Sequence, residues 1–194
     1  MTKKFAFDLD GTVTTVETLP LLARELGLSK EMKRLTDATL VGEIPFEQSF
    51  RLRHGMLKSI PLERICEIMS KVPLDPAIEK FIRGHREQCA LVTGNLDCWI
   101  APISVKLGCE TFSSTLDAKG RLIVLDKSSA IKKLRTSADR VIAIGESFND
   151  ISMMKAADIS IAYGGVHRPI DAAVAIADFI AFDGVSLCRM LKAL

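Results

Sequence analysis

The sequence lacks the features of a membrane, secreted or nucleic-acid-binding protein. In its 194 residues no apolar run is long enough to cross a bilayer, and the amino-terminal segment MTKKFAFDLDGT reaches acidic residues after only a short apolar stretch. The 26 basic and 24 acidic side chains leave a formal net charge of only +2, and the basic residues form no long run that could follow a phosphate backbone. We therefore expect neither nucleic acid nor a membrane as a partner.

Cysteine and histidine are too scattered to form a recognisable zinc site. The five cysteines include no C-x-x-C pair, and no histidine lies at a zinc-like spacing from them. We expect reduced, mostly buried thiols in a cytoplasmic protein. The three histidines, His54, His85 and His167, are each interpreted as a surface or helix-end residue.

Short apolar runs alternate with helix-like segments along the chain, which predicts an α/β fold. The pattern indicates a Rossmann-like, mainly parallel sheet covered by helices. The turn sequence DAKG at 117–120 separates two further extended segments and predicts a β-hairpin. The expected strands cover residues 5–10, 89–94, 141–146, 159–164 and 178–182.

The segment from about Val13 to Val72 differs from the rest, because apolar residues recur there at helical spacing and no strand is convincing. Gly27 and Gly42 are expected to end helices within it. We predict a core domain formed by residues 1–13 and 74–194, with residues 14–73 inserted as a helical cap domain.

Two carboxylates follow the first predicted strand. Asp8 and Asp10 lie two residues apart, so an extended backbone directs both to the same side. In parallel sheets ligands bind outside the carboxyl ends of strands, and Gly11 permits a close backbone approach there. An isolated pair of this kind fits equally well a strand that simply ends in a turn.

Three further polar segments make a site more plausible than a turn. Thr93-Gly94-Asn95 ends the second predicted strand, and Glu146, Asn149 and Asp150 follow the strand at 141–146. Acidic residues at two strand ends indicate a shared cation. Lys127 begins a helix-like stretch and could hold a phosphoryl oxygen, although a single lysine is more often a solvated surface residue.

Taken in order, these segments resemble the four motifs of the haloacid dehalogenase superfamily. The matching segments are DLDGT at 8–12, VTGN at 92–95, Lys127 and GESFND at 145–150. Within the superfamily the chain is similar to the phosphoserine phosphatases, and the similar stretches are ET at 17–18, GEIPFEQSFRLR at 42–53 and NDISM at 149–153.

The resemblance implies hydrolysis of a phosphomonoester through an aspartyl-phosphate. Asp8 would attack phosphorus, and Asp10 would protonate the leaving oxygen and then deprotonate water. Thr93, the Gly94 N–H, Lys127 and Asn149 would hold phosphoryl oxygens.

The resemblance also implies Mg²⁺ as cofactor. The expected ligands are Asp8, the backbone carbonyl of Asp10 and Glu146, with Asp150 near enough to act through water. The family usually carries aspartate where this chain has Glu146, and we expect Glu146 to coordinate directly.

For the substrate, the resemblance assigns Glu17 to an ammonium group and Arg53 to a carboxylate, which together fit L-phosphoserine. Phe46 would add an apolar wall, although it equally fits a core aromatic between helices. Three alternatives stay open: a phosphatase for another small phosphorylated metabolite, a phosphotransferase, and a phosphate-accepting or catalytically weakened binding module. Both a monomer and a homodimer are compatible with the sequence.

Overall fold

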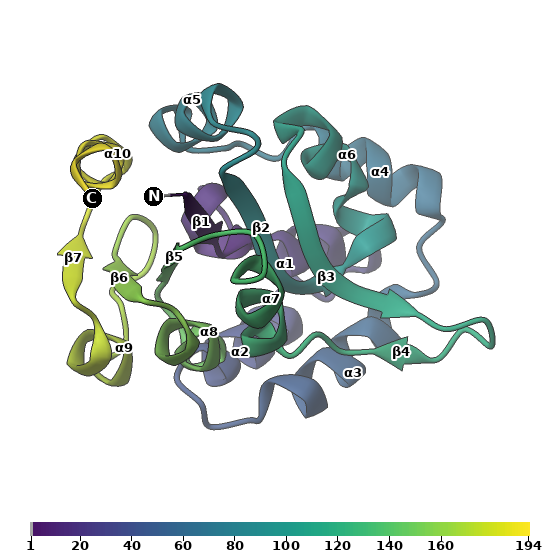
Figure 1. Cartoon of the computed structure of the whole chain (residues 1–194). Coiled ribbons are helices and arrows are strands. Elements are labelled where there is room, and N and C mark those ends of the chain that lie inside the picture. The colour runs from purple at the N-terminus through teal and green to yellow at the C-terminus, as the bar shows by residue number, and fades with distance from the viewer. Residues whose placement is uncertain (1) are drawn as a thin grey trace.

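The structure, a computed structural model, describes residues 2–194 and contains one seven-stranded sheet with helices on both faces (Figure 1). The strand order is β4-β3-β2-β1-β5-β6-β7, and every neighbouring pair is parallel except β3 and β4. The predicted α/β fold is thus confirmed. The strands are β1 (Lys3–Phe7), β2 (Cys89–Leu96), β3 (Glu110–Leu116), β4 (Leu122–Ile123), β5 (Arg140–Gly145), β6 (Ile159–Tyr163) and β7 (Phe179–Ala181).

Both faces of the sheet are apolar, because alternate side chains of its central strands enter two separate hydrophobic clusters. On β1, Phe5 and Phe7 belong to one cluster and Ala6 to the other. One face is covered by α5 (Pro76–Gly84), α6 (Asp97–Leu107) and α10 (Gly184–Ala193). The other is covered by α7 (Lys127–Leu134), α8 (Ile151–Ala156) and α9 (Asp171–Ile176).

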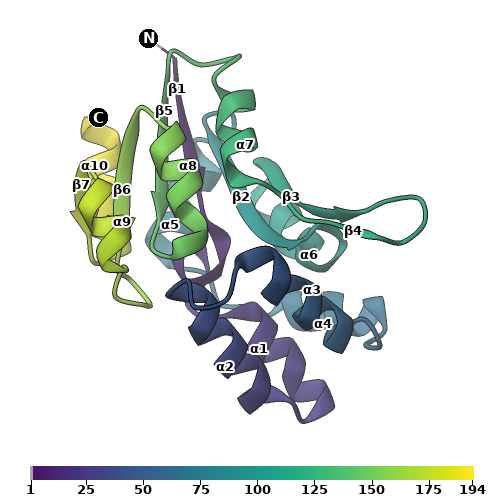
Figure 2. The ribbon, with the colours of Figure 1, turned by 90° about the horizontal axis from the view of Figure 1, so that it is seen from below.

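The remaining helices lie beyond the carboxyl ends of the parallel strands, as Figure 2 shows. They are α1 (Thr18–Leu22), its continuation η2 (Ala23–Leu26), α2 (Ser29–Leu40), α3 (Phe46–Leu57) and α4 (Leu62–Ser70). The predicted succession of helices is confirmed, and Gly27 and Gly42 follow helix ends with φ of 68° and 83°. We refer to residues 14–73 as the helical insert; its status as a separate domain stays a prediction.

Two details of the sheet can be compared with the sequence prediction. The first strand ends at Phe7 instead of residue 10, because the chain turns tightly over Leu9–Val13 (η1), with Gly11 at a φ of 80°. The hairpin at 117–120 is confirmed, and Asp117 N–H donates to the Arg121 carbonyl at 2.9 Å.

The cysteines are less buried than expected. Cys89 and Cys188 are buried, but the other three are partly exposed, so the prediction of mostly buried thiols is only partly correct.

Among the described residues, none of the helices has the length and apolar character needed to span a bilayer.

Candidate active site

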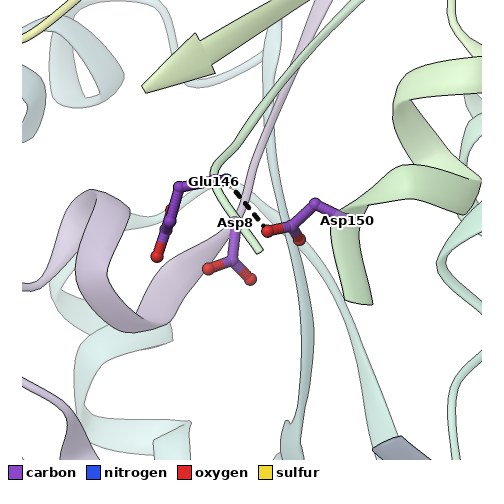
Figure 3. A group of neighbouring side chains, drawn as sticks. All are labelled: Asp8, Glu146 and Asp150. Carbon is purple, nitrogen blue, oxygen red and sulfur yellow. Dashed lines mark hydrogen bonds between the residues drawn. The ribbon is translucent and has the colours of Figure 1, made fainter. Parts of the chain in front are cut away.

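A cavity of about 50 Å³ lies where the carboxyl ends of β1 and β2 meet the helical insert. Segments far apart in the sequence contribute to its wall, because parallel strands end at the same edge of the sheet. Of the eleven residues to which the resemblance assigns a role, nine line it: Asp8, Asp10, Glu17, Phe46, Arg53, Thr93, Gly94, Lys127 and Asn149. The other two, Glu146 and Asp150, lie beside Asp8 (Figure 3).

Lys127, at the first residue of α7, is a buried ion-pair partner and not a surface residue. Its side chain is 2% exposed, and its Nζ contacts the Asp8 carboxylate and Asp150 Oδ1, the latter at 2.7 Å. Burial alone would lower the pKa of Lys127, but attraction to Asp150 and Asp8 outweighs burial and raises it. The lysine is therefore a fixed positive charge beside Asp8.

Asp150 organises the loop after β5 as well as pairing with Lys127. Its Oδ2 accepts hydrogen bonds from Glu146 N–H at 3.0 Å, Ser147 N–H at 2.9 Å and Ser147 Oγ at 2.8 Å. The Glu146 contact is the dashed line in Figure 3. These bonds fix the loop that carries Glu146 at the end of β5.

Glu146 presents one carboxylate oxygen without a partner. Its Oε2 accepts a short hydrogen bond from Thr12 Oγ1, whereas its Oε1 is buried and has no hydrogen-bond partner among the described residues. Burial raises the pKa of Glu146 well above its usual range, and repulsion from Asp8 and Asp150 adds to the rise. Burial likewise raises the pKa of Asp8, against the opposing effect of Lys127.

The three carboxylates fit a divalent cation. One oxygen each of Asp8, Glu146 and Asp150 lies within 4.8 Å of the others, and all three residues are buried. A donor set made only of oxygen atoms is better suited to Mg²⁺ than to softer metals. The orphaned Glu146 Oε1 is the atom that such an ion would satisfy.

Asp10 is held by the beginning of α1 and the end of β2. Its Oδ1 accepts hydrogen bonds from Thr18 N–H at 3.0 Å and from the Thr18 hydroxyl, and Asn95 Nδ2 lies 3.4 Å from its Oδ2. Because all these contacts are donated to the carboxylate, they fix its direction in the cavity wall.

Gly94 marks a close contact between the sheet and the helical insert. A Cβ atom at this position would lie 2.0 Å from the Phe46 ring, so any other residue here would displace that ring. Phe46 also stacks on Phe50, with ring centroids 5.5 Å apart. Phe46 thus lines the cavity, packs against Gly94 of the sheet and stacks on Phe50 of its own helix.

Arg53, on α3, is a buried cation with unused donors. Its side chain is 4% exposed, and its Nη2 has no hydrogen-bond partner among the described residues. Its remaining contacts are long, 3.4 Å to the Ser49 carbonyl and 3.5 Å to Thr36 Oγ1. Burial lowers the pKa of Arg53, which Asp10 and Glu17 oppose. Such a guanidinium is available to an anion in the cavity.

His167 is partly exposed, which agrees with the interpretation as a surface residue, but it also has a partner that the sequence did not indicate. His167 lies after β6, and its Nε2 is 3.0 Å from Glu17 Oε1. Burial raises the pKa of Glu17, and the hydrogen bond from His167 partly offsets that rise. The position of His167 just beyond the end of a parallel strand was the available sequence signal, but no spacing rule connects it to Glu17.

Comparisons with known proteins agree with this geometry. A family model described as haloacid dehalogenase-like hydrolase matches residues 5–155. A phosphoserine phosphatase of Methanocaldococcus jannaschii is 29% identical over 181 residues, which cover 83% of this chain and 85% of the relative. One from Archaeoglobus fulgidus is 28% identical over 175 residues, and there the match covers 81% of this chain but only 51% of the relative.

Solved structures match over the full length. A substrate-bound phosphoserine phosphatase complex has a TM-score of 0.85 at 27% identity, covering 100% of this chain and 99% of the other. A phospho-aspartyl intermediate analogue of phosphoserine phosphatase has a TM-score of 0.82 at 28% identity, covering 100% of both chains.

Proposed function

The chain belongs to the haloacid dehalogenase-like hydrolases, and we propose that it hydrolyses a small phosphomonoester bearing an amino and a carboxyl group, with L-phosphoserine preferred. The observation that carries this proposal is the meeting of two sets of charges in one cavity. Asp8 and Lys127 come from the sheet side, whereas Glu17 and Arg53 come from the helical insert. The first set fits phosphoryl transfer, and the second fits the two charged groups of an amino acid.

In the first half of the proposed reaction, Asp8 is the nucleophile. Its carboxylate oxygen attacks phosphorus, and the bond between phosphorus and the serine oxygen breaks. Asp10 gives its proton to the departing oxygen, so that serine leaves as a neutral alcohol. The product on the protein is an aspartyl-phosphate, and a relative of this fold has been solved as an analogue of that intermediate.

In the second half, Asp10 acts as the base. It accepts a proton from a water molecule, the water oxygen attacks phosphorus, and the bond to Asp8 breaks to give inorganic phosphate. The hydrogen bonds from Thr18 and Asn95 keep the Asp10 carboxylate facing the cavity in both steps. The same residue thereby serves as acid and then as base.

Several groups are proposed to hold the phosphoryl oxygens during the two transfer steps. Lys127 supplies a buried positive charge next to Asp8. Thr93, the N–H of Gly94 and Asn149 line the same cavity and can donate hydrogen bonds. In a site shielded from water, such donors stabilise the transition state more than they would in bulk solvent.

Mg²⁺ is the proposed cofactor, held by Asp8, the carbonyl of Asp10 and Glu146. When bound it neutralises charge between the anionic nucleophile and the phosphoryl oxygens. We propose that the main role of Asp150 is to pair with Lys127 and to hold the amides of residues 146 and 147, with which it forms hydrogen bonds. Its contribution to the metal is therefore proposed to be indirect, through the loop that carries Glu146.

Substrate entry is proposed to require movement of the helical insert. The cavity of about 50 Å³ holds only a few water molecules. It is bounded on one side by Phe46, whose ring packs directly on Gly94 of the sheet. Opening would separate these two residues, and closing would exclude water and bring Glu17 and Arg53 to the substrate.

Phosphate release from four matched compounds tests the proposal. L-phosphoserine carries both charged groups, phosphoethanolamine lacks the carboxylate, 3-phosphoglycerate has a hydroxyl in place of the ammonium, and p-nitrophenyl phosphate has neither group. We expect the highest kcat/KM for phosphoserine with Mg²⁺ and no release with EDTA. Release from none of the four would refute the enzyme, and equal kcat/KM for all four would refute the substrate class.

A further inference from the structure

Glu17 has a neighbour that the proposed reaction does not use. His167 lies on the loop between β6 and α9, and its Nε2 is 3.0 Å from Glu17 Oε1. Among the described residues it is the one side chain that forms a hydrogen bond with the Glu17 carboxylate. The contact joins the sheet side of the molecule to the beginning of the helical insert.

His167 and the cavity lie on opposite sides of Glu17. Glu17 lines both the cavity and a separate groove outside it, whereas His167 lines only the outer groove. The histidine side chain is 33% exposed and that of Glu17 is 17% exposed. His167 is not part of the cavity wall, so any effect of His167 on a molecule bound there would pass through Glu17.

The tight turn after Asp10 supports the same pair. A Cβ atom at Gly11 would lie 3.2 Å from both Glu17 Oε1 and His167 Cδ2, so the two side chains pack closely against this turn. Gly11 also has a φ of 80°, which other residues rarely adopt. The turn that carries Asp10 is thus in close contact with Glu17, the residue proposed to bind the substrate ammonium.

We propose that His167 is a positioning residue for substrate recognition, which holds Glu17 Oε1 so that Oε2 faces the cavity and receives a substrate ammonium group. This inference rests on the proposed function of Glu17. A carboxylate at the end of a flexible side chain loses conformational freedom when it binds a cation. A hydrogen bond that fixes the carboxylate beforehand reduces that loss and favours phosphorylated amines over other phosphomonoesters.

Two substitutions and a matched control test the role. His167→Ala removes the donor, and His167→Gln retains an N–H donor on a side chain of similar length. Arg168→Ala is the control on the same loop, because Arg168 is 87% exposed and its Asp171 partner is 3.7 Å away. Each variant is assayed with the four phosphate compounds described above, and its thermal unfolding is recorded.

We expect His167→Ala to raise KM about tenfold for phosphoserine and phosphoethanolamine, with little change in kcat. The values for 3-phosphoglycerate and p-nitrophenyl phosphate should stay the same, and His167→Gln should restore most of the loss. If the unsubstituted enzyme ignores the ammonium group, the proposed substrate class fails and this inference with it. If that enzyme prefers the ammonium compounds but His167→Ala affects all four alike, or Arg168→Ala has the same effect, only the inference fails. If His167→Ala does not fold, His167→Gln alone tests the role of His167. Loss of the ammonium preference in His167→Gln, which retains a donor, would overturn the inference.

Discussion

Replacing Arg53 by alanine should separate recognition of the substrate carboxylate from the chemistry at phosphorus. Before substrate binds, the donors of Arg53 are almost unused. Nη2 has no partner among the described residues, and the hydrogen bonds of Nε and Nη1 are long, at 3.4 and 3.5 Å. The side chain is 4% exposed, so a pair with a carboxylate would form away from water. Nearly all of the interaction is therefore gained when the substrate binds.

The size of the effect follows from the number of hydrogen bonds. One hydrogen bond to a charged group contributes about 1.5–3 kcal/mol, and a bidentate pair forms two. Allowing for the cost of ordering the substrate, we expect a loss of about 3 kcal/mol, which is roughly a hundredfold in kcat/KM. Arg53→Lys keeps the charge but not the planar guanidinium group, so its kcat/KM should lie between those of the unsubstituted enzyme and Arg53→Ala.

The assay compares phosphoserine with phosphoethanolamine, which has no carboxylate. The hundredfold loss should appear with phosphoserine alone. Folding should be little affected, because the substitution removes a buried cation with few hydrogen bonds. It also removes the contacts of Arg53 Cζ with the ring centroids of Phe46 at 5.7 Å and Phe50 at 6.0 Å. An equal loss with both compounds would refute the reasoning, because Arg53 would then support the cavity and not the carboxylate.

Three other substitutions or conditions test the sheet side of the site. Asp8→Asn should abolish phosphate release but keep or raise the melting temperature, since it removes a buried negative charge beside Asp150; measurable turnover would displace Asp8 as nucleophile. Glu146→Asp should weaken Mg²⁺ binding about tenfold in calorimetry, because the shorter side chain loses its bond to Thr12; unchanged affinity would contradict this. The raised pKa of Glu146 means that, without metal, stability falls as pH rises through it, so Mg²⁺ should raise the melting temperature more at pH 8 than at pH 5. An equal rise at both would count against the site.

The sequence was sufficient to predict the elements that carry the site, because each of its motifs directly follows an apolar run. Asp8, Thr93 and Glu146 could be assigned to one edge of a parallel sheet from the ends of these runs alone. The end of the first strand was less predictable. Apolar periodicity continues through Leu9, whereas the positive φ of Gly11 and the turn around it depend on the surrounding structure.

Contacts between distant loops could not be predicted from spacing. His167 reaches Glu17 across 150 positions, and Thr12 reaches Glu146 across 134. Each contact depends on how two irregular segments cross the edge of the sheet, and neither periodicity nor local turn chemistry determines such a crossing. The burial of Lys127 belongs to the same class, since only the position of α7 against β2 and α8 shows that this lysine is enclosed.

The charges around Asp8 support the proposal that a cation acts there together with Lys127. When ionised, Asp8, Glu146 and Asp150 carry three negative charges in a buried volume, and Lys127 balances only one of them. Burial raises the pKa values of Asp8 and Glu146, and repulsion from the neighbouring carboxylates adds to the rise, so both carboxyl groups bind protons more readily than free ones would. The proposed divalent cation would offset the remaining negative charge and favour the ionised form of Asp8. Because Thr12 already binds Glu146 Oε2, the longer glutamate still presents a single free oxygen to that cation.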